Sequence, residues 1–235
     1  TNMLTVMATN INRKNSAGRL FEVGRLYRSK TLPPKEQPEE RPALSIGLFG
    51  EGEDFFTLKG AVESVMALLG AEVDYERSQE PYLHPGRQAR AMLSGEQVAV
   101  FGEVHPKTAE MMGIDERVYV AELQLPPLFA VEKPMVVYRS LPKFPAVTRD
   151  LSLVCERSLP VATLEKAIRS AAGKLLESLK LFDVYEGDRI APDKKSVAYS
   201  LTLRSGERTL TDEESSEVVG RVIQALEAAG AVLRS

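Results

Sequence analysis

Cysteine, histidine and tryptophan are almost absent from this 235-residue sequence, which has one cysteine, two histidines and no tryptophan. The single cysteine, Cys155, excludes an intramolecular disulfide framework and a metal cluster of cysteine ligands. No apolar run approaches the roughly 18 residues that span a bilayer, and the first residues lack the pattern of a secretory signal. With 43% hydrophobic residues available for cores, we expect a soluble protein of the reducing cytoplasm with no membrane partner.

A strong excess of positive charge is also missing, since the net charge is −3. Residues 1–138 carry 15 Lys and Arg against 19 Asp and Glu, a net −4, whereas residues 139–235 carry 15 against 14, a net +1. This balance argues against a nucleic-acid binder driven by electrostatics alone. The second region can still hold RNA through a local basic stripe, with a modest contribution that depends on salt.

The first 50 residues predict a helix, a strand, a loop and a second strand. Residues 1–12 place Met3, Leu4, Met7 and Ile11 on one helical face that must pack on something. Because the chain starts at a threonine, we expect it to be a piece of a longer protein. A strand follows at 20–27, with Leu20, Val23, Leu26 and Tyr27 as its apolar contacts. The proline-rich segment 29–42 predicts an exposed loop before the strand 43–50.

The remainder of the first region predicts an antiparallel sheet with helices on one side. Residues 55–69 repeat apolar side chains with helical spacing and end at Gly70. Short strands follow, and a short helix or turn precedes the prolines that we take as a domain boundary after residue 138. The predicted strands are 71–76, 89–94, 97–104 and 118–123, and the predicted turn is 126–131.

Residues 139–235 predict a second domain with the order strand, helix, strand, strand, helix, strand, at 149–155, 160–172, 174–186, 195–204, 212–229 and 231–234. This is the βαββαβ pattern of a ferredoxin-like fold. Thr211 and Glu214 form the sequence signature of a capping box at the second helix. Both helices have one apolar face, so we expect them to cover one side of a four-stranded sheet and to leave the other side free to bind. The fold class is therefore α+β.

Catalytic and metal sites find little support in the sequence. His84 and His105 each precede a proline in segments that look like loops, and neither has partners for a metal site or a nucleophilic triad. We therefore expect both histidines to make structural hydrogen bonds. Gly47, Gly50 and Gly52 lack the spacing of a phosphate-binding loop and are expected in turns. We predict no catalytic residue and no metal ligand.

Asp183 and Tyr185 are the most informative pair. Two residues apart on a predicted strand, they point to the same face. A carboxylate beside a phenol ring can hydrogen-bond and stack on a planar base. Periodicity alone favours the simpler alternative, in which Tyr185 only covers the sheet.

The chain resembles the C-terminal part of the beta subunit of bacterial phenylalanyl-tRNA synthetases along nearly its whole length. In the second domain the resemblance rests on the segments KFPAVTRDLSLV (143–154), GKLLESLKLFDVYEG (173–187) and SGERTLTDEE (205–214). In the first it rests on ATNINRK (8–14), LFEVGRLY (20–27), LKGAVE (58–63), YLHPGRQAR (82–90) and FGEVHPKT (101–108). It implies an antiparallel-sheet class II synthetase-like domain at 1–138, followed by a ferredoxin-like anticodon-binding domain at 139–235.

The resemblance favours the base-binding interpretation of the pair. It implies that Asp183 and Tyr185, with Ser196 on the neighbouring strand, engage an anticodon base. Basic residues near these strand ends are either candidates for the RNA backbone or an ordinary solvated surface, and Arg149 is equally a partner for Asp150. These candidates are Lys143, Arg149, Lys194, Lys195, Arg204 and Arg208.

The resemblance also implies that the whole ligase uses ATP and Mg²⁺ in an (αβ)₂ assembly, with the active site on the alpha subunit. The expected partners are tRNA(Phe) and that subunit, and no DNA. In the first domain, the segment LFEVGRLYR and the single Gly86-Arg87 pair only partly match the strands that bind ATP in class II enzymes. We therefore expect this piece to bind no cofactor and to catalyse nothing.

Two other classes of function remain open. One is a ferredoxin-like regulatory module that binds a small molecule and is fused to an interaction domain. The other is a free-standing enzyme built on the first domain, which the missing phosphate-binding residues disfavour.

Overall fold

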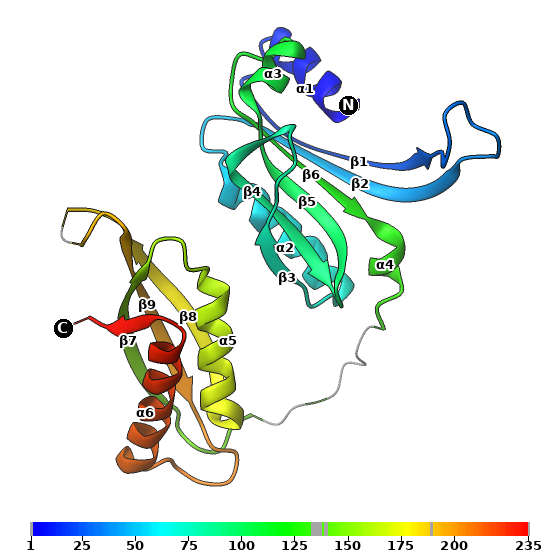
Figure 1. Cartoon of the computed structure of the whole chain (residues 1–235). Coiled ribbons are helices and arrows are strands. Elements are labelled where there is room, and N and C mark those ends of the chain that lie inside the picture. Colours follow the sequence, from blue (N-terminus) through cyan, green and yellow to red (C-terminus); the bar gives the residue numbers. More distant parts are fainter. Residues whose placement is uncertain (1, 133–137, 139–140, 189, 235) are drawn as a thin grey trace. The chain divides into compact units, whose positions relative to one another are not determined.

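A computed structural model describes residues 2–132, 138, 141–188 and 190–234 (Figure 1). The chain divides into two compact units, residues 1–136 and 137–235, called here the N-terminal and C-terminal units. The predicted boundary after residue 138 adjoins residues 139–140, which lie outside the described residues. Within the described part, none of the helices has both the length and the apolar composition needed to cross a bilayer.

The N-terminal unit is built on a six-stranded sheet of order β1-β2-β6-β5-β4-β3, in which every neighbouring pair is antiparallel. Its strands are β1 (Ala17–Arg28), β2 (Glu39–Gly50), β3 (Asp74–Arg77), β4 (Leu83–Leu93), β5 (Glu96–Val104) and β6 (Val118–Gln124). Its helices are α1 (Asn2–Asn12), α2 (Phe55–Leu69), α3 (Pro106–Met111) and α4 (Leu125–Phe129). The predicted antiparallel sheet is confirmed.

Helices lie on both faces of this sheet, so the prediction of helices on one side is wrong. Leu58, Val62 and Met66 of α2 share a buried cluster with alternate residues of the strands, among them Phe101. Met3 and Met7 of α1 belong to a different cluster, which contains the intervening strand residues. Gly47 lies within β2, so its assignment to a turn is wrong. A side chain there would meet both methionine sulfurs within 2.8 Å, so glycine lets α1 approach β2.

The helix α2 has the predicted bounds and well-defined ends. Asp54 accepts a hydrogen bond from the Thr57 backbone N–H, and the Thr57 hydroxyl oxygen accepts one from the Asp54 backbone N–H, which completes a capping box. At the other end Gly70 adopts a left-handed conformation with φ of 72°, which costs glycine little.

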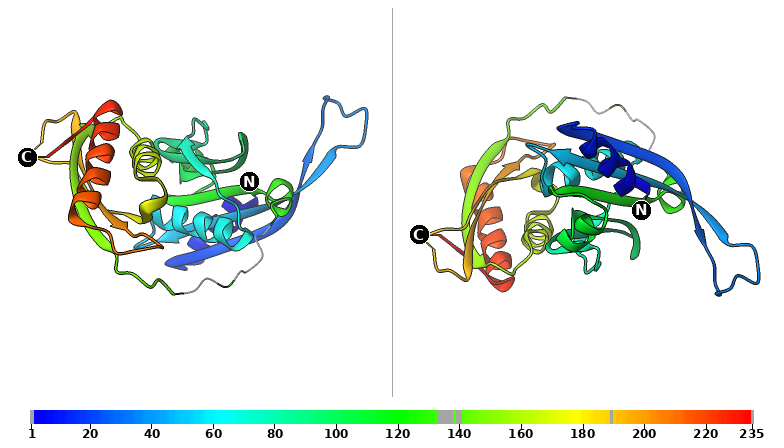
Figure 2. Two further views of the ribbon diagram at one scale, coloured as in Figure 1. Left: turned by 90° about the horizontal axis from the view of Figure 1, so that it is seen from below. Right: turned by 90° about the horizontal axis from the view of Figure 1, so that it is seen from above.

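The sequence predicted that the apolar side chains of β1 make packing contacts, and for most of them this prediction is wrong. Val23, Leu26 and Tyr27, expected in apolar contacts, are 63%, 52% and 64% exposed, and Leu20 alone packs against a cluster. The reason is that β1 is an edge strand, which runs with β2 into a two-stranded arm (Figure 2). The predicted loop 29–42 is also too long, because β2 already begins at Glu39.

Proline in β2 is compatible with the sheet for a geometric reason. Pro42 pairs with Arg25 of β1, whereas the pairing of β2 with β6 spans Ala43 to Phe49. Residues 39–42 therefore pair with β1 alone, and a proline there costs no sheet hydrogen bond when its nitrogen faces the unpaired side.

The C-terminal unit has the predicted βαββαβ order and a four-stranded antiparallel sheet of order β10-β7-β9-β8. Its elements are β7 (Val147–Glu156), α5 (Val161–Ala172), a 3₁₀ turn (Gly173–Leu175), β8 (Leu176–Tyr185), β9 (Lys194–Leu203), α6 (Asp212–Ala228) and β10 (Ala231–Leu233). Leu164 and Ile168 of α5 and Val222 and Leu226 of α6 share one buried cluster with the sheet. Both helices therefore cover the same face (Figure 1).

The predicted capping box of α6 is present and is joined by an ion pair. Thr211 accepts from the Glu214 backbone N–H at 3.2 Å, and Glu214 accepts from the Thr211 N–H at 3.0 Å. Arg208 holds the same carboxylate with both terminal guanidinium nitrogens. Hydrogen bonding by Arg208 first, and then by the Thr211 backbone, lowers the pKa of Glu214 from 4.5 to about 2.

This pKa shift predicts a pH dependence of stability. A carboxylate with a lowered pKa in the folded state stabilises fully above pH 4.5, and its contribution is lost as the pH falls toward 2. We expect the Glu214→Gln variant to lose stability at neutral pH and to show a flatter decline below pH 4.5. Urea unfolding followed by circular dichroism at several pH values measures this. Glu217→Gln, on an exposed position of the same helix, is the control, and equal behaviour of the two variants would contradict the assignment.

Candidate nucleic-acid interface

The face of the C-terminal sheet opposite α5 and α6, called here the open face, is defined by strand register. Val197, Tyr199, Leu201 and Leu203 of β9 are fully buried against the helices, so the alternate residues of β9 point the other way. Their register partners complete three rows across the sheet: Tyr185, Ser196, Val154 and Val232; Asp183, Ala198 and Ser152; Lys180, Ser200 and Asp150.

A β-bulge in β8 determines that Asp183 and Tyr185 lie on this face. Leu181 pairs with Tyr199 and packs toward the helices, whereas Asp183 pairs with Ala198, so Phe182 is an extra residue. Regular alternation from Leu181 would have turned Asp183 and Tyr185 toward the helices. The bulge instead brings both side chains to the open face.

Ser196 lies directly opposite Tyr185 in the register and shares its face. Ser196 and Ala198 are 4% and 8% exposed, because their small side chains lie between larger residues of the flanking strands. The structure therefore brings Asp183, Tyr185 and Ser196 together on one face, and their contact with a base stays a prediction.

Arg234 is a neighbour of this group that the sequence analysis missed. Its backbone N–H donates to the Ser152 carbonyl at 2.8 Å, which continues the pairing of β10 with β7. Its side chain reaches over β7, and Nη1 donates to Ser196 Oγ at 3.5 Å. The available signal was its spacing of two from Val232 on the last predicted strand.

The ring of Tyr185 lies over Gly187, at the turn that follows β8. A Cβ at Gly187 would stand 2.6 Å from the Tyr185 hydroxyl oxygen and 2.8 Å from Cζ. Glycine at this position therefore makes room for the ring. The arrangement offers a planar ring, a carboxylate acceptor and a hydroxyl within one row or adjacent rows, which suits an unpaired base.

Two of the predicted basic residues lie at the start of β9 and make different contacts. Lys194 pairs with Glu156, its partner in the β7–β9 register. Lys195 points the other way, is 8% exposed, and donates to the Leu159 carbonyl at 2.6 Å. The structure does not bring Lys195 to the open face, because the alternation along β9 turns it toward α5.

Three arginines that were predicted to contact the RNA backbone are bound to other groups of the C-terminal unit. Arg149 donates to Asp212 and Ser215 at the start of α6, both at 3.1 Å, and the alternative pairing with Asp150 is wrong. Arg204 holds Glu177 and the Phe144 carbonyl, and Arg208 holds Glu214. Lys143 is exposed and precedes β7.

In the N-terminal unit, the arginine of the Gly86-Arg87 pair forms an ion pair within the protein. Arg87 donates Nη2 to Glu103 Oε1 at 2.8 Å and Nε to the other carboxylate oxygen. The Glu103 side chain is 3% exposed. Arg87 is therefore occupied by a carboxylate, and this arrangement does not fit an ATP phosphate.

Both histidines make the expected structural hydrogen bonds. His84 Nδ1 accepts from the Gly86 N–H, and His105 Nδ1 accepts from the Lys107 N–H as the cap of α3. His84 lies within β4, so its assignment to a loop is wrong. Among the described residues, no group of three or more His, Cys, Asp or Glu is placed to hold a metal ion.

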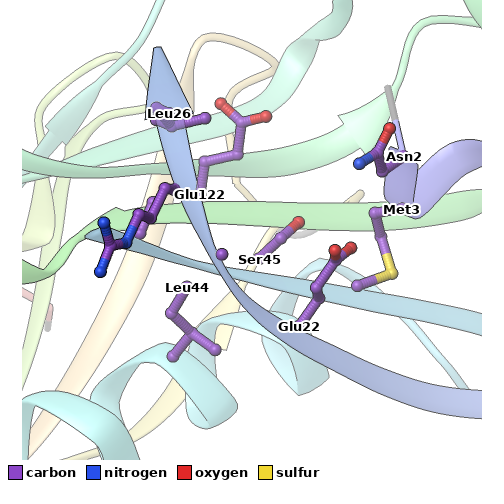
Figure 3. A pocket seen from close by; sticks show the side chains of 10 residues that line it. Asn2, Met3, Glu22, Leu26, Leu44, Ser45 and Glu122 are labelled. Atoms are coloured by element: carbon purple, nitrogen blue, oxygen red, sulfur yellow. The ribbon is translucent and has the colours of Figure 1, made fainter. Parts of the chain in front are cut away.

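A pocket of about 340 Å³ lies between α1 and the strands β1, β2 and β6 (Figure 3). Glu22 and Glu122 present carboxylates to it, beside Ser45 and Asn2. Arg25, which also lines it, is paired with Glu40. Two carboxylates repel an anion, so this pocket does not fit nucleotide phosphates.

Comparison with known proteins gives two matching families. Residues 1–125 match the family described as the phenylalanyl tRNA synthetase beta chain CLM domain, and residues 142–234 match the ferredoxin-fold anticodon binding domain. The chain is similar to phenylalanine–tRNA ligase beta subunits, with 44% identity to that of Symbiobacterium thermophilum, 41% to that of Shouchella clausii and 38% to that of Bacillus subtilis. These matches cover 99%, 96% and 96% of this chain and 27%, 30% and 29% of the relatives. The chain thus spans less than a third of their length.

Proposed function

Since the match over residues 1–125 shows that this chain belongs to the phenylalanyl-tRNA synthetase beta chain family, we propose that it serves in tRNA recognition and subunit packing. Residues 139–235 bind the anticodon of tRNA(Phe), and residues 1–138 pack against the catalytic alpha subunit of an (αβ)₂ ligase in the cytoplasm. The ligase as a whole uses ATP and Mg²⁺, and the chemistry takes place outside this piece.

The observation that carries the anticodon proposal is the register that sets Asp183, Tyr185 and Ser196 on one face. Tyr185 stacks on the first anticodon base, while the carboxylate and the hydroxyl accept and donate hydrogen bonds at its edge. Stacking contributes affinity for any base, and the edge contacts contribute selectivity. Of the basic residues expected at the RNA backbone, Lys194 is paired with Glu156, and Lys143 is exposed before β7.

Two features of the N-terminal unit support its packing role. The side chains of Phe21, Val23 and Tyr27 are exposed on one face of the edge strand β1, with Arg25 between the last two. Such exposed apolar side chains are expected of a surface that another subunit covers. Arg87 is engaged by Glu103 rather than free for a phosphate. This unit therefore acts as a scaffold and not as a second active site.

The test is binding of the chain to an RNA hairpin with the phenylalanine anticodon, against a hairpin whose first anticodon base is changed. We expect the chain to prefer the matched hairpin. Tyr185→Ala should weaken binding to it by about 5- to 150-fold, since stacking on one base contributes about 1–3 kcal/mol. Asp183→Ala should remove most of the preference between the hairpins.

The control is Tyr27→Ala, which removes an exposed tyrosine from the other unit and should leave RNA binding unchanged. Equal affinity of the unaltered chain for both hairpins would refute anticodon recognition. Saturable binding of phenylalanine, without any effect of RNA, would favour the small-molecule module instead.

A further inference from the structure

We propose that Lys180 and Arg234, rather than the basic residues predicted from the sequence, hold the phosphate backbone of RNA on the open face. This inference rests on the proposed function and deepens it. Some basic side chains of the C-terminal unit have carboxylate or carbonyl partners, and others do not.

The strand-end cations are mostly engaged within the protein. Lys194 is paired with Glu156, Arg149 with Asp212, Arg204 with Glu177 and Arg208 with Glu214. A phosphate that recruits one of them must compete with a partner already in place, so the gain per contact is reduced.

Lys180 lies on the open face in the middle of β8. Its neighbours Leu179 and Leu181 pack into the core, so its side chain points to the opposite side of the sheet. Its register partner is Ser200, it is exposed, and it has no ion-pair partner among the described residues. A free ammonium group on the RNA-binding face is available to a phosphate.

Arg234 lies on the same face at the other side of the sheet. Its only hydrogen bond from the side chain, within the described residues, is the long one to Ser196 Oγ, so most of its donors remain available. Lys180 and Arg234 thus flank the small residues of β9 from opposite sides. The carboxylates of Asp150 and Asp183 on the same face keep it nearly neutral overall, which is consistent with a weak dependence of binding on salt.

Lys180 is five residues from Tyr185 along β8. At about 3.3 Å per residue, and less at the bulge, the two side chains stand roughly 15 Å apart. Stacked nucleotides rise about 3.4 Å each, so Lys180 reaches a phosphate several nucleotides from the stacked base. Its contribution should therefore not depend on which base Tyr185 meets.

The experiment measures the affinity of the chain for the matched and changed hairpins over a range of KCl concentrations. We expect Lys180→Gln and Arg234→Gln each to weaken binding to both hairpins by the same factor, about fivefold at low salt. Each should also reduce the slope of log affinity against log salt by about 0.7, the value for one contact to a single strand. Lys180→Arg should restore the slope.

The matched control is Arg221→Gln, which removes the same charge from α6, on the helix-covered side. An equal effect of this control would overturn the inference, because net charge would then explain the loss. Unchanged affinity and slope in Lys180→Gln and Arg234→Gln would also overturn the inference. The proposed function would still stand in that case if the chain preferred the matched hairpin. Absence of that preference in the unaltered chain would overturn the proposed function, and this inference with it.

Discussion

Replacing Arg87 by methionine should destabilise the N-terminal unit by about 3 kcal/mol at neutral pH. The substitution leaves Glu103, 3% exposed, as a buried charge without its partner. Removing one member of a buried ion pair typically costs about 3–5 kcal/mol. We expect the lower end, because the Arg87 side chain is 41% exposed and water can enter in its place.

The contribution of Glu103 to the pH dependence of stability should change sign in the variant. Burial alone would raise the pKa of Glu103, but hydrogen bonding and charge from Arg87, with smaller contributions from His84 and Arg117, hold it below 4.5. The pair therefore stabilises the unaltered chain above pH 4.5 and less as the pH falls. Without Arg87, burial raises the pKa of Glu103, so the contribution of this group to stability should be greatest in acid and decline as the pH rises.

Hydrogen–deuterium exchange of peptides from β4 and β5 measures the effect within this unit. Arg90→Met is a matched control on the same strand, since its pair with Glu76 is exposed on both sides and should cost no more than about 1 kcal/mol. Combining Arg87→Met with Glu103→Leu should recover most of the loss, because the buried charge is then gone. A cost below that of the Arg90 control would show that water solvates Glu103 adequately.

The elements that the sequence predicted well are those with local signals. The helix at 55–69 has a cap at each end and a continuous apolar face, and the capping box of Thr211 and Glu214 marks the start of α6. The errors concern tertiary context. The apolar residues of β1 are typical of a strand, but only the sheet order reveals that β1 is an edge. Periodicity likewise gave no indication that α1 and α2 lie on opposite faces.

The candidate site shows the same division between local and tertiary information. That Asp183 and Tyr185 share a face follows from their spacing, but the choice of face depends on the bulge at Phe182. A bulge adds one residue to one strand and has no reliable signature in a single sequence. The partners of Arg149 and Arg204 could not be predicted from the sequence either, since Asp212 and Glu177 are distant from them along the chain. Arg208, by contrast, pairs with the nearby capping-box residue Glu214. Lys180 was overlooked because it lies in the middle of a strand.

Truncation of Phe101 to alanine should cost about 3–5 kcal/mol, the range for a large buried aromatic residue. Phe101 is fully buried in β5, with its ring stacked on Phe55 at 5.7 Å and edge-to-face with Tyr75 at 6.1 Å. The hydrophobic cluster that contains it consists of residues from the N-terminal unit, whereas the cluster beneath the open face consists of residues from the C-terminal unit. We therefore expect hydrogen exchange to accelerate in β1–β6 but not in β7–β10.

The consequence for function is that Phe101→Ala should still bind the matched hairpin with unchanged preference. Leu226→Ala provides the reciprocal variant, because Leu226 of α6 is fully buried under the C-terminal sheet. It should cost about 2–5 kcal/mol, accelerate exchange in β7–β10 and reduce RNA binding in proportion to the unfolded fraction. If Phe101→Ala abolished binding at a temperature where β7–β10 remain protected, RNA recognition would depend on both units. Unchanged binding would instead assign RNA recognition to the C-terminal unit, because the residues that contact the base are held by the hydrophobic core of that unit.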